Sequence, residues 1–275
     1  MIKKLLVILV ATVVLVATGA FVSIAYANHS WGAYHWARTS NPFTLNLGKN
    51  LSGLWPAHLG TASTEWSVSE VLDTTVVPGN TNAAKGKNTP KNCVPTSGRV
   101  EVCNSKYGKN GWLGVAQIWV LGNHITQSTV KVNDTYFNTA RYNTPAWRQF
   151  VMCQEVGHTF GLDHQDENFS NGNLGTCMDY TNDPSGTLYN QLSNERPNQH
   201  DYAQLETIYA HLETAFTSVF GKKSPAPASV DNDIDTSNPS EWGKVTRKSS
   251  DGRSSLHERD LGKGQKLFTF VIWAN

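Results

Sequence analysis

Charged side chains are scarce in this sequence. Asp, Glu, Lys and Arg make up 16% of its 275 residues, and the formal net charge is +1. A protein that binds nucleic acid through its phosphates carries a basic excess, so the composition gives no case for nucleic acid as a partner. With 22 Gly and 9 Trp, the chain fits a neutral, loop-rich extracellular protein better than a helical cytosolic one.

Long hydrophobic runs are also missing, except at the N-terminus. Lys3 and Lys4 precede an almost entirely apolar stretch, residues 5–24, and Ala25-Tyr26-Ala27 has the small-residue pattern of a cleavage site. We predict a signal peptide over residues 1–27 and a secreted protein with no membrane contact after cleavage. The apolar stretch is long enough to span a bilayer, so an uncleaved signal anchor at the outer face of the membrane remains the alternative.

Cysteine is rare, and none of the four cysteines has a Cys-x-x-Cys partner. A zinc site made of cysteines is therefore not expected. An even number in an exported chain indicates disulfides, with three possible connectivities. We favour Cys93–Cys103, which would close a short loop, and Cys153–Cys177. Free, buried thiols are the alternative.

The stretch from Gln154 to His164 holds the residues that can carry chemistry. Its sequence is Gln-Glu-Val-Gly-His-Thr-Phe-Gly-Leu-Asp-His. On a helix, Gln154 and His158 are one turn apart on the same face, so both can hold one metal ion while Glu155 faces its water. Gly161 tolerates positive φ, which lets the chain turn and bring His164 round as a third ligand. A catalytic zinc needs three protein ligands and an open position for water.

This stretch resembles the signature of the metzincin zinc metalloproteases, which include the matrixins and astacins: H-E-x-x-H-x-x-G-x-x-H followed by a Met-turn. The Met-turn candidate is Cys177-Met178-Asp179-Tyr180. The one departure is Gln154, which stands where the family has its first His. The alternative is an amphipathic core helix with incidental histidines, but it does not explain the offsets of Gly161 and His164.

The resemblance implies a zinc-dependent endopeptidase that acts on a protein or peptide substrate and that we expect to be a monomer. One catalytic Zn²⁺ would be held by Gln154, His158 and His164, with Glu155 as the general base. Met178 would form a hydrophobic floor, and the Cys153–Cys177 bridge would tie that floor to the helix. Tyr180 has the offset of a residue that reaches the metal or stabilises the oxyanion in astacin-like enzymes. A purely structural Tyr180 is an equal alternative.

Gln154 leaves three outcomes open. An amide oxygen is a harder donor than imidazole and suits zinc less well. Gln154 could still ligate the metal, or a residue such as Asp166 or a His from the C-terminal tail could complete the shell. In the third outcome the metal is lost, and the protein is a catalytically weak or inactive peptide-binding module on a metzincin scaffold.

The resemblance implies a metzincin-like α+β fold: a twisted, mostly parallel sheet with one antiparallel edge strand, an active-site helix, a Met-turn and a C-terminal helix. Hydrophobic periodicity predicts strands at 43–47, 71–77, 100–102, 113–120 and 125–132, and helices at 55–66, 145–161 and 200–211. The resemblance makes Leu113-Gly114-Val115-Ala116 the open edge that pairs with substrate backbone. A plain strand whose Gly marks a bulge is the alternative.

Three parts follow the signal peptide in the predicted domain organisation. Residues 28–218 form the catalytic domain, 219–240 a polar linker and 241–275 a small β-rich tail. The linker contains Asp231-Asn232-Asp233-Ile234-Asp235, which resembles a calcium loop but lacks the Gly and Glu that an EF-hand needs next. A loose Ca²⁺ site is therefore only a weak alternative. The apolar run 267–273 predicts a strand that packs back on the domain or within a separate appendage.

Overall fold

The computed structural model describes residues 29–81, 90–213 and 236–275. The predicted signal peptide, most of the predicted linker and the candidate calcium segment at 231–235 lie outside these residues. Within the described ranges, no helix combines the length and the apolar character that a membrane span requires.

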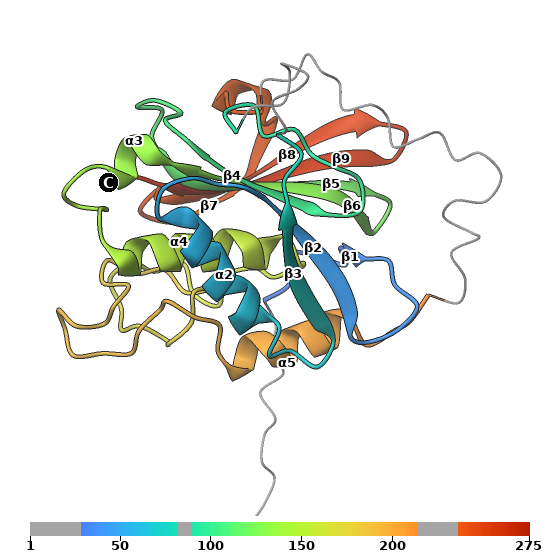
Figure 1. The fold of residues 1–275 in the computed structure, drawn as a ribbon, viewed down its shortest axis with the longest axis horizontal. Coiled ribbons are helices and arrows are strands. Elements are labelled where there is room, and N and C mark those ends of the chain that lie inside the picture. The colour runs from blue at the N-terminus through green and yellow to red at the C-terminus, as the bar shows by residue number, and fades with distance from the viewer. Residues whose placement is uncertain (1–28, 82–89, 214–235) are drawn as a thin grey trace, which may run out of the picture.

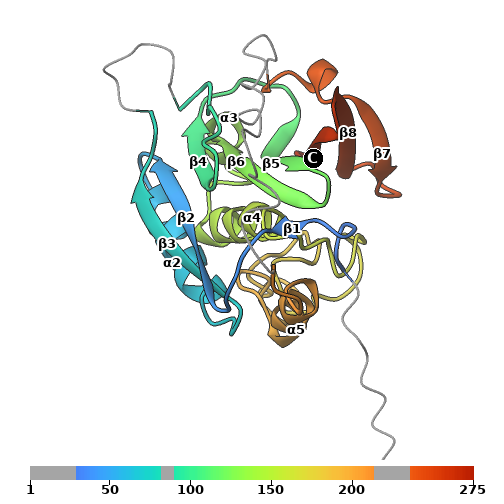
Figure 2. The same ribbon diagram turned by 90° about the vertical axis from the view of Figure 1, so that its right-hand side faces the viewer.

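One nine-stranded sheet dominates the molecule, and the helices α2, α4 and α5 lie on one side of it (Figures 1 and 2). The strands follow the order β3-β2-β4-β6-β5-β9-β8-β7, and β1 lies beside β6. The strands are β1 (His35–Trp36), β2 (Phe43–Asn50), β3 (Leu72–Pro78), β4 (Val100–Ser105), β5 (Trp112–Leu121), β6 (His124–Asn133), β7 (Lys244–Lys248), β8 (Ser254–Gly262) and β9 (Gln265–Trp273). The helices are α2 (Trp55–Trp66), α3 (Asp134–Phe137), α4 (Pro145–His158), α5 (Gln199–Ile208) and the short 3₁₀ turn η2 (Pro239–Glu241).

The sheet changes character at β5. Strands β1, β2, β3, β4 and β6 pair in parallel, β5 is antiparallel to β6, and β9, β8 and β7 continue antiparallel. The predicted α+β class, with a largely parallel central sheet, is confirmed at this coarse level. All five predicted strands and all three predicted helices are present, with ends that differ by a few residues.

The position of β5 differs from the prediction. Residues 113–116 do not form an open edge, because β9 pairs with β5 on the side away from β6. Ala116 lies opposite Phe270 and Gly114 opposite Ile272. The register shifts between Trp112 and Gly114, so the alternative in which the glycine marks a bulge is the one observed.

Helix α4, which carries the motif, begins at residues that favour a helix start. The Thr144 side chain accepts a hydrogen bond from the Trp147 amide, and Pro145 occupies the first turn, both of which favour a helix start. The helix ends at His158, before the predicted Gly161. Gly161 has φ of +101°, a left-handed conformation that glycine adopts easily.

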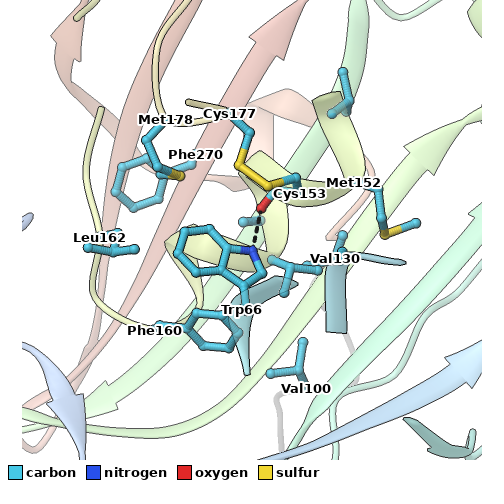
Figure 3. Close-up of a cluster of buried hydrophobic side chains, with 14 of the residues drawn as sticks. Trp66, Val100, Val130, Met152, Cys153, Phe160, Leu162, Cys177, Met178 and Phe270 are labelled. Atoms are coloured by element: carbon cyan, nitrogen blue, oxygen red, sulfur yellow. Dashed lines mark hydrogen bonds between the residues drawn. A yellow bond between two sulfur atoms is a disulfide. The ribbon is translucent and has the colours of Figure 1, made fainter. Parts of the chain in front are cut away.

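The core closes around α4 (Figure 3). Trp66 of α2 donates an indole hydrogen bond of 3.2 Å to the Cys153 carbonyl. A Cβ added at Gly157 would lie 2.7 Å from the Met178 sulfur and 2.7 Å from the Trp66 ring. Gly157 therefore lets α2 and the Met-turn approach the same turn of α4.

The described part of the C-terminal tail belongs to this same core. Side chains from β9 are buried together with those of α2 and α4: Phe268, Phe270 and Ile272. Of the two alternatives for the apolar run, packing back on the domain is the one observed.

Candidate metal centre and active site

The end of α4 and the turn after it bring two of the predicted ligands, His158 and His164, together. Gln154, Glu155 and His158 are each at most 1% exposed. The positive-φ turn at Gly161 returns the chain so that the His164 ring lies 4.5 Å from the His158 ring, at 86°. Two imidazoles separated by six positions thus meet in space, as the motif predicts.

Each of the two imidazoles is held by a hydrogen bond at Nδ1, which leaves Nε2 as the atom that can bind a metal ion. His158 Nδ1 lies 2.9 Å from the Leu162 carbonyl oxygen, so Nδ1 carries the proton and donates. His164 Nδ1 lies 3.3 Å from Glu167 Oε1, and its Nε2 is buried without a partner. Metal-binding histidines are anchored in this way, with the far nitrogen left as the ligand atom.

Gln154 is also held through one end. Its Nε2 donates to the Cys177 carbonyl at 3.0 Å, and because a carbonyl only accepts, this contact fixes the amide orientation. Its Oε1 is left buried and without a partner. The side chain therefore presents an unpaired oxygen on the same helix face as His158.

The Glu155 side chain is a buried carboxyl group. Among the described residues neither oxygen has a hydrogen-bond partner of ordinary geometry. Burial raises the pKa of Glu155 well above the ordinary value, and the Ala116 backbone lowers it by a smaller amount. A Cβ at Gly114 would lie 2.7 Å from Glu155 Oε1. Gly114 thus provides space for the Glu155 side chain in this structure.

The Met-turn lies against this group of residues. The Tyr180 ring is 4.3 Å from the His164 ring, and burial raises the pKa of its phenol, which interacts with the Ser254 side chain. Both expected disulfides are present, Cys93–Cys103 and Cys153–Cys177. The second bridge links α4 to the residue before Met178.

Two residues that the motif does not predict complete the surroundings. Phe270 of β9 stacks on His158, with ring centroids 4.2 Å apart and planes at 14°. Arg247 of β7 binds Asp163 through Nη1 at 2.6 Å and Glu167 through Nε at 3.0 Å. The sequence around these residues does not indicate which partners they contact. The apolar run 267–273 predicts only that the tail is buried.

These contacts leave the motif closed to solvent. A cavity of about 440 Å³ lies nearby, lined by Phe169, Thr181, Asn182, Tyr189 and neighbouring residues. Phe169 stacks on Tyr180 at 4.4 Å, and Tyr180 contacts His164. Two aromatic rings therefore separate this cavity from the nearest proposed ligand.

The residues fit a metal ion by the chemistry of their unpaired atoms. Buried polar atoms without partners are rare and costly, yet Gln154 Oε1, His164 Nε2 and both Glu155 oxygens are all in this state. Imidazole nitrogen and amide oxygen are neutral donors that a zinc ion accepts, the nitrogen more readily. A cation held at this point would satisfy donors that the protein alone leaves unpaired.

Comparison with known proteins adds little to this geometry. No protein-family model matches the chain, and no curated protein does. Among solved structures, the chain is similar to high choriolytic enzyme 1, a hatching-enzyme zinc protease from the medaka fish Oryzias latipes. The identity is 9% and the TM-score 0.36, over 67% of this chain and 98% of that one. A likeness of that strength carries no argument about activity, so a functional conclusion depends on the residues of the site itself.

Proposed function

We propose that this protein is a secreted, metzincin-type zinc endopeptidase. Gln154, His158 and His164 hold the ion, and Glu155 is the general base. The observation that supports this most directly is that all three proposed ligands are anchored through one atom, while Gln154 Oε1 and His164 Nε2 have no hydrogen-bond partner among the described residues. His158 and His164 donate through Nδ1, and Gln154 donates through Nε2.

Glu155 and Tyr180 have separate roles in the proposed hydrolysis. Zinc, when bound, lowers the pKa of its water towards about 7 and polarises the scissile carbonyl. Glu155 accepts the proton of that water and passes it to the leaving amine. A nearby cation favours the charged carboxylate, which counteracts the burial that raises the pKa of Glu155. The phenol of Tyr180 is protonated at neutral pH, as an ordinary tyrosine is, and burial raises its pKa further, so it can donate to a developing oxyanion.

The proposal includes an opening step. In this structure β9 fills the outer side of β5 and Phe270 covers His158. A substrate backbone can pair with 113–116 only after β9 has left that position. The described conformation is therefore the closed form of the proposed enzyme.

Glu155 provides the direct test. We would purify residues 28–275, supply zinc, and measure cleavage of an unfolded protein by wild type and Glu155→Ala. The control is His58→Ala, which replaces a histidine of α2 that lies outside the motif and contacts Gln149. Loss of a general base costs roughly 10²–10⁴-fold in rate, so Glu155→Ala should be inactive while His58→Ala keeps wild-type activity and a chelator abolishes it. Wild-type protein that neither cleaves nor binds zinc through His158 would rule the enzyme out.

A matched substitution tests the unusual ligand. Gln154→His restores imidazole at this position and should tighten zinc binding by about tenfold or more, because imidazole is the better donor. Gln154→Leu should weaken it. Equal zinc affinity in all three proteins would mean that Gln154 is not a ligand.

A second candidate function is a metzincin-type protein that does not cut. One observation favours it: β5 is paired on both sides without a substrate. Such a protein need hold no catalytic zinc, so the zinc content of the α4 site separates the two candidates.

A further inference from the structure

A second group of metal-type side chains lies apart from the α4 motif, where three distant segments meet. His35 of β1 and His124 of β6 are register partners in the parallel β1–β6 pair. His211 and Glu213 belong to the chain that follows α5. These four residues form the histidine–glutamate cluster.

The distances within the cluster match one metal ion. His35 Nε2 lies 3.1 Å from His211 Nε2 and 3.4 Å from Glu213 Oε1. His211 Nε2 lies 3.6 Å from the same carboxylate oxygen. Ligand atoms about 2.0–2.1 Å from a tetrahedral zinc are roughly 3.3–3.4 Å apart, which is the spacing seen here. His124 Nε2 lies 3.1 Å from Glu213 Oε1, within reach as a fourth donor.

The protonation of His35 explains why a cation suits this place. His35 Nδ1 is 2.9 Å from the Ala33 carbonyl oxygen, so Nδ1 donates and the lone pair of Nε2 faces His211 Nε2 at 3.1 Å and Glu213 Oε1 at 3.4 Å. A lone pair that faces a carboxylate oxygen is repulsive unless a proton or a metal lies between them. The His35 residue is only 6% exposed, so little water can reach the space between these atoms. A metal ion bound between them would accept their lone pairs and remove the repulsion.

The segment that carries His211 and Glu213 is held in place independently of the cluster. The Arg38 guanidinium donates to the His211 carbonyl, and the Glu213 amide donates to the Arg38 carbonyl at 3.0 Å. Arg38 also stacks over the Tyr209 ring at 4.7 Å. The donor atoms are therefore brought together by contacts that do not involve a metal.

We propose that His35, His211 and Glu213, with His124 as the fourth donor, bind one zinc ion at a structural site. Zinc suits a set of imidazoles and one carboxylate, whereas calcium and magnesium prefer oxygen ligands. The ion would fasten the N-terminal strand β1 and the chain after α5 to the end of β6. The site shares no residue with the α4 centre and does not depend on the proposed activity.

The test isolates this cluster from the α4 motif by working in the His158→Ala background. Zinc would be titrated into the metal-stripped chain, residues 28–275, as His158→Ala, His158→Ala/His211→Ala and His158→Ala/His58→Ala. His211 has a 56% exposed side chain, so its replacement should not prevent folding. We expect the first and third proteins to bind about one equivalent, and the second to bind at least tenfold more weakly, since even second-sphere changes cost about 10–100-fold in affinity.

Two further measurements separate ligation from structural damage. His211→Cys keeps a zinc donor and should restore binding that His211→Ala loses. Cobalt in place of zinc should give the visible absorption of a tetrahedral site, present in His158→Ala and absent when His211 is also alanine. Equal zinc affinity with and without His211 would overturn the proposal.

Discussion

At the scale of single residues, Gly114 is placed where a methyl group has no room. Its added Cβ would come within 2.6 Å of Val151 Cγ1 and 2.7 Å of Glu155 Oε1. Gly114→Ala should therefore destabilise the protein by about 1–3 kcal/mol, as overpacking does, and should displace Glu155. Gly60, inside α2 with nothing within 4 Å of its added Cβ, is the matched control.

The two glycines should behave oppositely in denaturant unfolding. Gly60→Ala should gain about 0.5–1 kcal/mol, because alanine suits a helix interior better than glycine. A Gly114→Ala variant as stable as wild type would show that β5 and α4 can move apart at no cost.

Asp179 gives a pH-dependent prediction. Burial raises its pKa from 3.8 to about 6, while the Leu174 amide and Asn194 act against the shift. A carboxyl with a raised folded-state pKa stabilises the fold at low pH and loses that contribution as the pH rises from about 4 through 6. Asp179→Asn keeps an acceptor oxygen without the charge and should raise stability by about 1–2 kcal/mol above pH 6.5. Thermal unfolding between pH 4 and 8 should show the gain vanish near pH 4; a gain that does not depend on pH would contradict this account.

Individual residues were the part of the site most open to prediction. Helix geometry places Gln154 and His158 on one face, and Gly161 has the positive φ that the return of His164 requires. The contacts of Phe270 and Arg247 could not be predicted in this way. They join residues about 80 to 110 positions apart, and no local pattern specifies such a partner.

At the scale of elements, the hairpin β8–β9 and strand β7 are attached to the motif through Arg247. Its partner Asp163 has a 9% exposed side chain, whereas the Arg247 side chain is 37% exposed. Arg247→Met removes the only Arg or Lys partner of this carboxylate among the described residues and leaves it the His164 amide as a donor. We expect this change to weaken the docking of β7–β9 by about 1–3 kcal/mol, below the cost of breaking a fully buried pair. If pairing of β9 with β5 limits activity, kcat/KM of Arg247→Met should be higher than that of wild type. The backbone amides of β9 should also exchange their hydrogens with solvent faster in this variant.

Arg259→Met is the control on the same hairpin. Arg259 pairs with Glu241, and both side chains are about one-third exposed, so little should change. Unaltered exchange and kcat/KM in Arg247→Met would mean that Arg247 does not hold the closed form.

Helices and strands could be predicted where neighbouring residues in the sequence determine them. The pairing of strands that are far apart in the sequence could not. Thr144 and Pro145 set the start of α4, and Asn198 with Asp201 forms the capping box of α5. The alternation of apolar residues in β5 indicates a strand but says nothing about which strand lies beside it. That pairing requires β9, about 150 residues further along the chain, so the predicted open edge was wrong.

At the scale of the whole molecule, the tail is needed for the core. Five side chains of β9 are at most 5% exposed: Leu267, Phe268, Phe270, Val271 and Ile272. Burying each one contributes about 1.5–3 kcal/mol, and their sum is comparable with a typical total stability of about 5–15 kcal/mol. A chain truncated after residue 240 should therefore be insoluble or unfolded by circular dichroism.

A shorter truncation is the control for that prediction. Removing only Asn275 costs one backbone hydrogen bond to the Tyr142 hydroxyl and should leave the fold intact. A folded 28–240 fragment would show that the tail is an independent appendage.

The pairing of β9 with β5 also affects how readily a free peptide can bind at β5. Because β9 belongs to the same chain, it competes for β5 as an intramolecular ligand, and tethered ligands act at effective concentrations of about millimolar. A free peptide must reach comparable levels, or pair more strongly, before it can take that place. Dilute peptides would thus be poor substrates even for a fully competent metal centre, and a substrate anchored nearby would have the advantage.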